Sequence, residues 1–214
     1  MELQTQIMNK NWEIGKTPMT LDKINKKEVN IAIYDRDISS LTKEVKKLLY
    51  MNIELRFNGS IEAILNSIST TIDHEIFGSI IKDIHQLLKL FGETSDSNSF
   101  RFLLASVNSN MCQKFHTDIN DLRMLCTYYG PGTLWLTDDN INRQALNSFG
   151  DEEFIALDES KIQQARTGSA IILKGAIYPS EGTKAVVHRS PTLEESVETR
   201  LLLRIDTNEF LNFE

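Results

Sequence analysis

The stretch Arg200-Leu-Leu-Leu-Arg-Ile-Asp206 decides the fold class, because its side chains alternate between two kinds of surface. In a β-strand successive side chains point to opposite faces, so the odd-numbered leucines and isoleucine share one face. The two arginines and the aspartate, all at even numbers, share the other face. The stretch therefore predicts a strand with an apolar face against a core and a charged face turned elsewhere.

Arg200 and Arg204 on this strand give the first indication of a ligand. Burial of a guanidinium costs free energy unless a carboxylate or a phosphate accepts its hydrogen bonds. A bound dicarboxylate would meet that need. In the alternative interpretation, both arginines form structural salt bridges with Asp206 or Asp118.

Similar short apolar runs, separated by turn residues such as Gly130-Pro-Gly132, fill the chain from residue 100 onward. Many short strands with few helices between them predict a sandwich or a barrel. The candidate strands are Phe100–Val107, Cys112–Asp118, Leu122–Tyr129, Thr133–Leu136, Glu153–Leu157, Ser169–Lys174, Lys184–His188 and Arg200–Asp206.

The first ninety-nine residues read mainly as helices, because apolar residues recur there at intervals of three and four. The polar run Glu93–Ser99 predicts a loop between the two parts. We expect residues 1–99 to form a helical segment with one short strand, packed on one face of a β-rich core formed by residues 100–214. The expected elements are a strand at Asn30–Tyr34, helices at Ser40–Tyr50 and Ser60–Ile72, and a third helix whose apolar stripe runs from Phe77 to Phe91 and ends at Gly92.

His116, Asp118 and His188 are the candidate metal ligands. A histidine and an aspartate two residues apart on an extended segment point to the same side, and a distant histidine completes the two-histidine, one-carboxylate face that binds non-haem Fe(II). Cys112 shares that face, and a thiolate ligand would favour zinc over iron. In the alternative interpretations, Asp118 merely orients His116 in an exposed turn, and His188 is a hydrogen-bonded core residue.

Composition excludes several classes of function. The chain has 214 residues and a net charge of −7, with a pI of about 5.2, so it lacks the basic surface that nucleic acid requires. Its N-terminus lacks the features of a signal peptide, and no apolar run is long enough to cross a membrane. We expect a cytoplasmic protein with no nucleic-acid or membrane partner, in which Cys112 and Cys126 are thiols.

The second half of the chain contains six ordered blocks: Phe115–Asp118, Leu122–Tyr128, Gly130–Trp135, Leu173–Gly175, Val187–Pro191 and Arg200–Asp206. These blocks resemble the bacterial domain-of-unknown-function 1826 family. The resemblance implies membership of the family but no activity. Members of that family occur beside genes of zinc homeostasis and of a metal-handling GTPase. This implies, as an alternative, a zinc-binding protein or hydrolase with the GTPase as partner.

The order His116, Asp118, His188, with Arg200 twelve residues further on, resembles the Fe(II)/2-oxoglutarate dioxygenases, and especially their phytanoyl-hydroxylase-like branch. This resemblance implies an α+β protein whose core is a double-stranded β-helix, the jelly-roll or cupin-like fold. It also implies an oxidoreductase in which the triad holds Fe(II) and Arg200 holds the distal carboxylate of 2-oxoglutarate.

The same resemblance extends to other residues around the metal. We expect Arg204 and Tyr128 to contact the cosubstrate, and Trp135 and Arg123 to line the pocket of a small-molecule substrate that the sequence does not identify. In the alternative interpretation, Tyr128 and Trp135 belong to the strand core. A cupin-like binding module without turnover is the third hypothesis for the whole chain.

Overall fold

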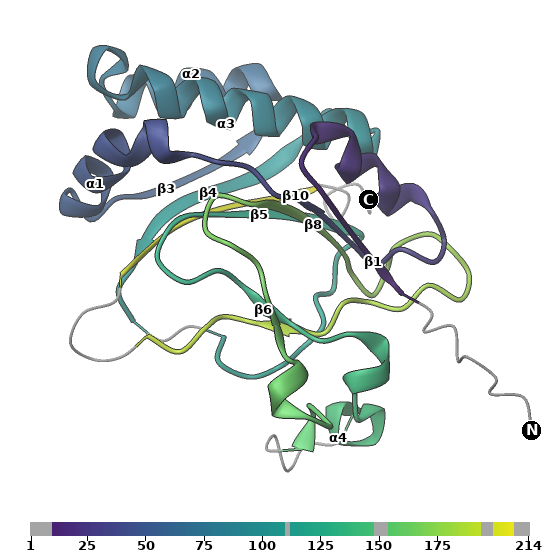
Figure 1. The fold of residues 1–214 in the computed structure, drawn as a ribbon. Helices are drawn as coiled ribbons and strands as arrows, with labels where there is room; N and C mark the ends of the chain where they lie inside the picture. Colours follow the sequence, from purple (N-terminus) through teal and green to yellow (C-terminus); the bar gives the residue numbers. More distant parts are fainter. Residues whose placement is uncertain (1–9, 110–111, 148–153, 194–198, 208–214) are drawn as a thin grey trace, which may run out of the picture.

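The computed structural model describes residues 10–109, 112–147, 154–193 and 199–207. Within these ranges the centre of the fold is a seven-stranded sheet of order β1-β2-β8-β5-β10-β4-β3 (Figure 1). The pairing of β1 with β2 is parallel, and every other pair in this large sheet is antiparallel. Its strands are β1 (Trp12–Gly15), β2 (Ile31–Tyr34), β3 (Glu54–Gly59), β4 (Phe100–Val107), β5 (Leu122–Tyr129), β8 (Ala170–Lys174) and β10 (Arg200–Thr207).

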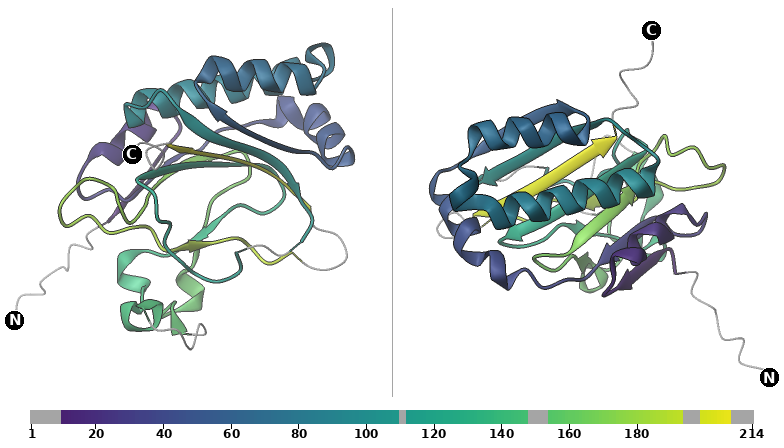
Figure 2. Two further views of the ribbon diagram at one scale, coloured as in Figure 1. Left: turned by 180° about the vertical axis from the view of Figure 1, so that it is seen from behind. Right: turned by 90° about the horizontal axis from the view of Figure 1, so that it is seen from above.

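Three helices, α1 (Thr42–Tyr50), α2 (Ile61–Thr71) and α3 (His74–Ser95), cover one face of the large sheet (Figures 1 and 2). Two of them begin after residue types that favour the start of a helix: Ser60 accepts a hydrogen bond from the amide of Ala63, and Asp73 accepts one from that of Glu75. None of the helices in the described ranges combines the length and the apolar character that a membrane span needs.

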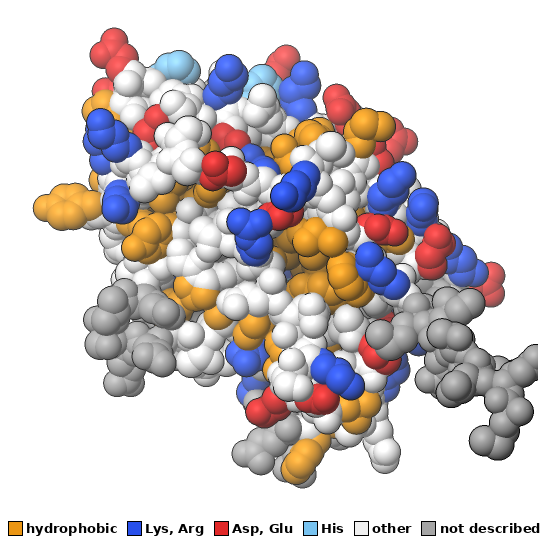
Figure 3. All heavy atoms as spheres, in the orientation of Figure 1, with side chains coloured by type: hydrophobic (Ala, Val, Ile, Leu, Met, Phe, Trp, Pro, Cys, Tyr) orange, Lys and Arg blue, Asp and Glu red, His pale blue; other side chains and the backbone are white. Residues whose placement is uncertain are grey.

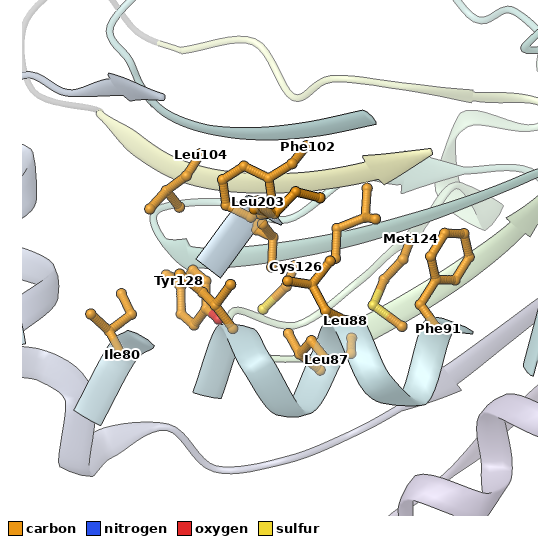
Figure 4. Packing of buried hydrophobic residues seen from close by; sticks show 14 of the residues in the cluster. Ile80, Leu87, Leu88, Phe91, Phe102, Leu104, Met124, Cys126, Tyr128 and Leu203 are labelled. Atoms are coloured by element: carbon orange, nitrogen blue, oxygen red, sulfur yellow. The ribbon is translucent and has the colours of Figure 1, made fainter. Parts of the chain in front are cut away.

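The main core lies between these helices and the large sheet. The apolar stripe of α3 contributes Ile80, Leu87, Leu88 and Phe91, which pack toward side chains of β5 and β10 (Figure 4). The odd-numbered apolar residues of β10 all belong to this cluster and are fully buried. The alternation of that strand is therefore confirmed, and its even-numbered charged face points away from the helices.

A small sheet of order β7-β6-β9 lies against the other side of the large sheet (Figure 1). His116 extends it through an isolated bridge to His188, with backbone hydrogen bonds of 3.0 Å in both directions. A second apolar cluster, which includes Ile33, Leu125 and Trp135, lies on this side of the large sheet. The strands are β6 (Leu134–Trp135), β7 (Gln163–Gln164) and β9 (His188–Arg189).

Several expected strands differ from the structure. Cys112–Asp118 forms only the single bridge at His116, and Cys112 at its start has a positive φ of 47°, which is not an extended conformation. Only His188 of the expected strand Lys184–His188 is in a strand. The expected strand Glu153–Leu157 begins outside the described residues, and its remainder forms only the bridge between Ala156 and Ile141.

The first part of the chain contributes more to the sheet than expected. It supplies β1 and β3 in addition to β2, and these two strands form the edges of the large sheet. A 3-10 helix at Pro18–Asn25 and a short α4 (Arg143–Asn147) were also not expected. On the face shown in Figure 3, acidic and basic side chains are interspersed with exposed hydrophobic ones.

Candidate metal centre

His116, Asp118 and His188 converge, as the sequence predicts. One ligand atom from each lies within 4.8 Å of the others. Nε2 of His188 is 3.3 Å from Oδ2 of Asp118, and Nε2 of His116 is 3.7 Å from Oδ1. Two ligands of one transition metal, each at about 2.1 Å from it and at right angles, lie roughly 3 Å apart. Small shifts of these side chains would therefore bring all three into coordination distance of one ion.

The two histidines present the same nitrogen to this point. Nδ1 of His116 lies 2.8 Å from the carbonyl oxygen of Lys114, and Nδ1 of His188 lies 3.2 Å from that of Val186. A carbonyl only accepts hydrogen bonds, so each Nδ1 carries a proton and each Nε2 is the nitrogen that faces the site. Backbone carbonyls commonly fix metal-binding histidines in this way.

The protonation states of Asp118 and His116 also suit a cation. Burial alone would raise the pKa of Asp118, but His188, Arg123 and His116 outweigh it and lower that pKa to about 2. Burial, and next to it the charge of His188, lowers the pKa of His116. At neutral pH the site therefore offers a carboxylate and a neutral imidazole, the forms that bind metals.

Arg123 holds Asp118 in place. Its Nη1 donates to Oδ2 of Asp118 at 2.5 Å, and its Nε donates to Oδ1 of Asp206 at 2.5 Å. Asp206 is fully buried and also accepts a bond of 3.3 Å from the amide of Asn120. Arg123 thus links Asp118 to a buried carboxylate on β10. It also lines a cavity beside the candidate metal site.

Two of the three candidate ligands, His116 and His188, line a cavity of about 110 Å³, which we call the central cavity. His116 and His188 line it from the small sheet, and the even-numbered face of β10 lines it from the large sheet. Its apolar lining includes Leu103, Ala105 and Leu202.

Arg200 lines the same cavity and is fully buried. Its Nη2 donates a hydrogen bond of 3.0 Å to Oγ1 of Thr127, while its buried Nε has no acceptor among the described residues. Burial lowers the pKa of Arg200 to about 10. Arg200 forms no salt bridge with Asp206 or Asp118, which both pair with Arg123. For Arg204 the salt-bridge alternative holds in part, because its Nε lies 3.3 Å from Oδ2 of Asp206.

Two residues expected beside the cosubstrate or substrate lie elsewhere. Tyr128 points to the helix side of the large sheet, where its hydroxyl donates to Oδ2 of Asp83 on α3 at 2.6 Å. Trp135 is buried in the second apolar cluster, with its ring edge to face against Trp12 at 5.7 Å, and it does not line the central cavity. Both positions agree with the alternative interpretation, in which Tyr128 and Trp135 belong to the core of the strands.

Cys112 and Arg204 do line the central cavity. Cys112 is an exposed thiol, and it does not belong to the cluster that His116, Asp118 and His188 form. Thr127 was not expected in the site, although its position in the sequence indicates it. It lies four residues after Arg123 on β5, and residues an even number apart on a strand share one face.

Residues 15–206 match the family described as protein of unknown function, DUF1826. The chain belongs to this family. No curated protein matches the DUF1826 chain in sequence.

Solved structures are similar to this DUF1826 chain in fold. AtDAO1, the dioxygenase for auxin oxidation 1 from Arabidopsis thaliana in its binary complex with 2-oxoglutarate, is 12% identical with a TM-score of 0.52, over 92% of this chain and 91% of AtDAO1. A bsmA homologue from Methylobium petroleophilum PM1 is 9% identical with a TM-score of 0.44, over 88% of this chain and 91% of the homologue. Of these two only AtDAO1 exceeds 0.5, and at 12% identity the likeness concerns the fold alone.

Proposed function

We propose that this protein is an Fe(II)- and 2-oxoglutarate-dependent oxygenase. The observation that carries the proposal is the meeting of two features at one cavity: a two-histidine, one-carboxylate triad whose histidines line the cavity, and a fully buried guanidinium at Arg200 that pairs with no described carboxylate. The triad suits Fe(II), and the guanidinium suits an anion that binds beside it.

The order of the strands supports a double-stranded β-helix as the core. From residue 100 onward the chain enters the large sheet at β4, passes to the small sheet at His116, and returns to the large sheet at β5. It then adds β6 and β7 to the small sheet, β8 to the large one, β9 to the small one and β10 to the large one. Eight segments shared equally between two facing sheets form a jelly roll. The likeness in fold to AtDAO1, whose structure contains 2-oxoglutarate, supports the same proposal.

Arg200 and Thr127 are the groups we assign to the distal carboxylate of 2-oxoglutarate. A buried guanidinium without an anion is unfavourable, and a planar carboxylate restores its hydrogen bonds in a bidentate pair. The hydroxyl of Thr127 already accepts from Arg200 at 3.0 Å, so its own proton is free to point at a second acceptor.

The triad fits Fe(II) by its donor set, since two imidazoles and one carboxylate are the side chains that would hold a non-haem Fe(II) ion and leave room for a cosubstrate. When bound, Fe(II) and 2-oxoglutarate supply oxidative chemistry that couples decarboxylation of the cosubstrate to hydroxylation of a substrate. The residues of this chain hold three positions of the ion and anchor the cosubstrate. They also line the cavity between the two sheets.

Metal analysis of protein purified without chelators, together with anaerobic calorimetric titration of 2-oxoglutarate and assay of succinate formation in air, tests the proposal. We expect iron, binding of 2-oxoglutarate and slow formation of succinate. Asp118→Ala should lose the metal and keep its fold, while Asp138→Ala, which removes a carboxylate of an exposed ion pair with Arg143, should keep both. Zinc without 2-oxoglutarate binding would support the zinc-protein hypothesis instead. Binding without any succinate would support the non-catalytic module.

A further inference from the structure

Four arginines, one on each of four neighbouring strands of the large sheet, gather at one end of the central cavity. In the register of the large sheet, Arg204 on β10 and Arg56 on β3 both stand opposite Leu103 on β4. One row further, Arg101 on β4 and Arg123 on β5 flank Asp206 of β10. Of these, Arg56, Arg123 and Arg204 line the cavity itself.

The carboxylates at this end do not balance these charges. Asp206 accepts both of its short ion-pair contacts from Arg123 and Arg204, at 2.5 and 3.3 Å, and Asp118 is a candidate metal ligand. Glu54 forms an exposed ion pair with Arg56. A divalent ion on the triad would add two further positive charges.

Of the three arginines in this group that line the cavity, Arg204 is the one that combines an accessible side chain with a buried nitrogen that makes no hydrogen bond to the described residues. Its side chain is 36% exposed, yet its Nε is buried and makes no hydrogen bond within the described residues. The contact of that Nε with Asp206 is an ion pair without hydrogen-bond geometry. Burial lowers the pKa of Arg204, and the charges of Arg123, Arg56 and Arg101 lower it further against the opposing effect of Asp206. An additional anion at this guanidinium would be attracted by the positive charges of Arg204 and of the arginines around it.

The cavity surface between Arg200 and Arg204 is apolar. Leu202 lies between them on β10, and Leu103 and Ala105 lie beside it on β4 in one buried cluster. Four residues of strand separate the two guanidinium-bearing Cα atoms by roughly 13 Å. This spacing suits two anionic groups on either side of an apolar strip.

We propose that Arg204 binds an anionic group of the primary substrate, and that this substrate is a small molecule with an apolar portion and a carboxylate or phosphate group. The proposal rests on the proposed function, in which Arg200 and Thr127 hold 2-oxoglutarate and the triad holds the metal. Arg56 lies at the exposed edge of the same surface and adds to the attraction of the anion as it enters.

Calorimetric titrations of phenyl phosphate, benzoate and neutral benzyl alcohol into anaerobic Fe(II) protein saturated with 2-oxoglutarate test this inference. We expect at least one of the two aryl anions to bind, and benzyl alcohol to bind far more weakly. Arg204→Gln should weaken binding of the anion by about ten- to a hundredfold, the scale of a charge-assisted contact, and leave 2-oxoglutarate binding unchanged. Arg204→Lys keeps the charge and should retain part of the affinity.

Arg143→Gln is the matched control, since Arg143 is 38% exposed, pairs with Asp138 and lies outside the central cavity. It should leave both affinities unchanged. Equal anion binding to wild type and Arg204→Gln, or no anion binding to wild type, would overturn the inference. Weaker 2-oxoglutarate binding to Arg204→Gln would place Arg204 with the cosubstrate and overturn it as well. If wild type does not bind 2-oxoglutarate, that result contradicts the proposed function and not this inference. The same anion titrations on protein without cosubstrate then decide whether Arg204 binds anions.

Discussion

Arg123 donates a hydrogen bond of 2.5 Å to Asp118, the carboxylate of the candidate metal triad. The same guanidinium is anchored on β10 through Asp206, which is fully buried. One oxygen of Asp118 therefore has a fixed direction before any ion binds. Groups that orient a ligand in this way are worth about ten- to a hundredfold in metal affinity.

Arg123→Gln should accordingly bind Fe(II) or Mn(II) about ten- to a hundredfold more weakly. It should also lower the free energy of unfolding by about 3 kcal/mol, because Asp206 loses its main partner while still buried. Metal titration and urea denaturation measure the two effects. Arg143→Gln, which breaks an exposed pair, should change neither. Unaltered metal affinity in a folded Arg123→Gln protein would show that Arg123 does not position the ligand.

Tyr128→Phe tests the placement of Tyr128 on the helix side of the sheet. The variant removes the hydrogen bond to Asp83, although Asp83 keeps its two bonds from Arg36. We expect a loss of about 1 to 2 kcal/mol in the free energy of unfolding, with metal and 2-oxoglutarate affinities unchanged. Tyr129→Phe, at an exposed neighbouring position, is the control and should be neutral. A selective loss of 2-oxoglutarate affinity in Tyr128→Phe would contradict this placement.

The strands of the sheet centre could be predicted because they alternate or are uniformly apolar along most of their length. The bounds of β4 and β5 agree with the sequence prediction, and β10 extends one residue further. The edge strands β1 and β3 were missed because each is partly exposed, so its apolar residues form no continuous run. In β3 the alternation of Leu55 and Phe57 with polar residues was the available signal.

The candidate triad could be predicted from residue types and their order in the sequence. To predict the other residues of the pocket, one must know which face of its strand each side chain occupies. Arg123 and Tyr128 are five residues apart on β5, so they cannot share a face of a regular strand. Placing both in one pocket was therefore wrong, and Thr127 has the parity that the pocket requires. The short strands of the small sheet gave no such guide, because two residues define no period.

The free energy of unfolding should rise with pH above about 8, because the pKa of Lys174 is lowered in the folded protein. This lysine is fully buried, donates to the backbone carbonyl of Lys26, and lies over the ring of Tyr178. Burial lowers its pKa from 10.5 to about 8, only partly opposed by Glu28. Between these two values the unfolded state binds more protons than the folded state, so unfolding becomes less favourable as pH rises, by up to about 3 kcal/mol in total.

Lys174→Met should remove this part of the pH dependence. Urea denaturation of both proteins between pH 7 and 10 gives the difference in slope, and comparing the two proteins cancels other groups that titrate in this range. Lys184→Met is the control, because Lys184 is exposed and should leave the slope as in wild type. Parallel pH profiles for wild type and Lys174→Met would refute the assignment.

Arg200→Lys separates the oxygenase from the alternatives. Lysine keeps the charge but cannot form the planar, bidentate pair with a carboxylate. We therefore expect the dissociation constant of 2-oxoglutarate to rise about ten- to a hundredfold, or about 1.5 to 3 kcal/mol, with metal affinity nearly unchanged. Anaerobic calorimetric titration of the Fe(II) protein measures both, and Arg204→Lys, on the same face of β10, is the control that should bind 2-oxoglutarate as wild type does. Equal binding to wild type and Arg200→Lys would move the anchor away from Arg200, and undetectable binding to wild type would end the dioxygenase proposal.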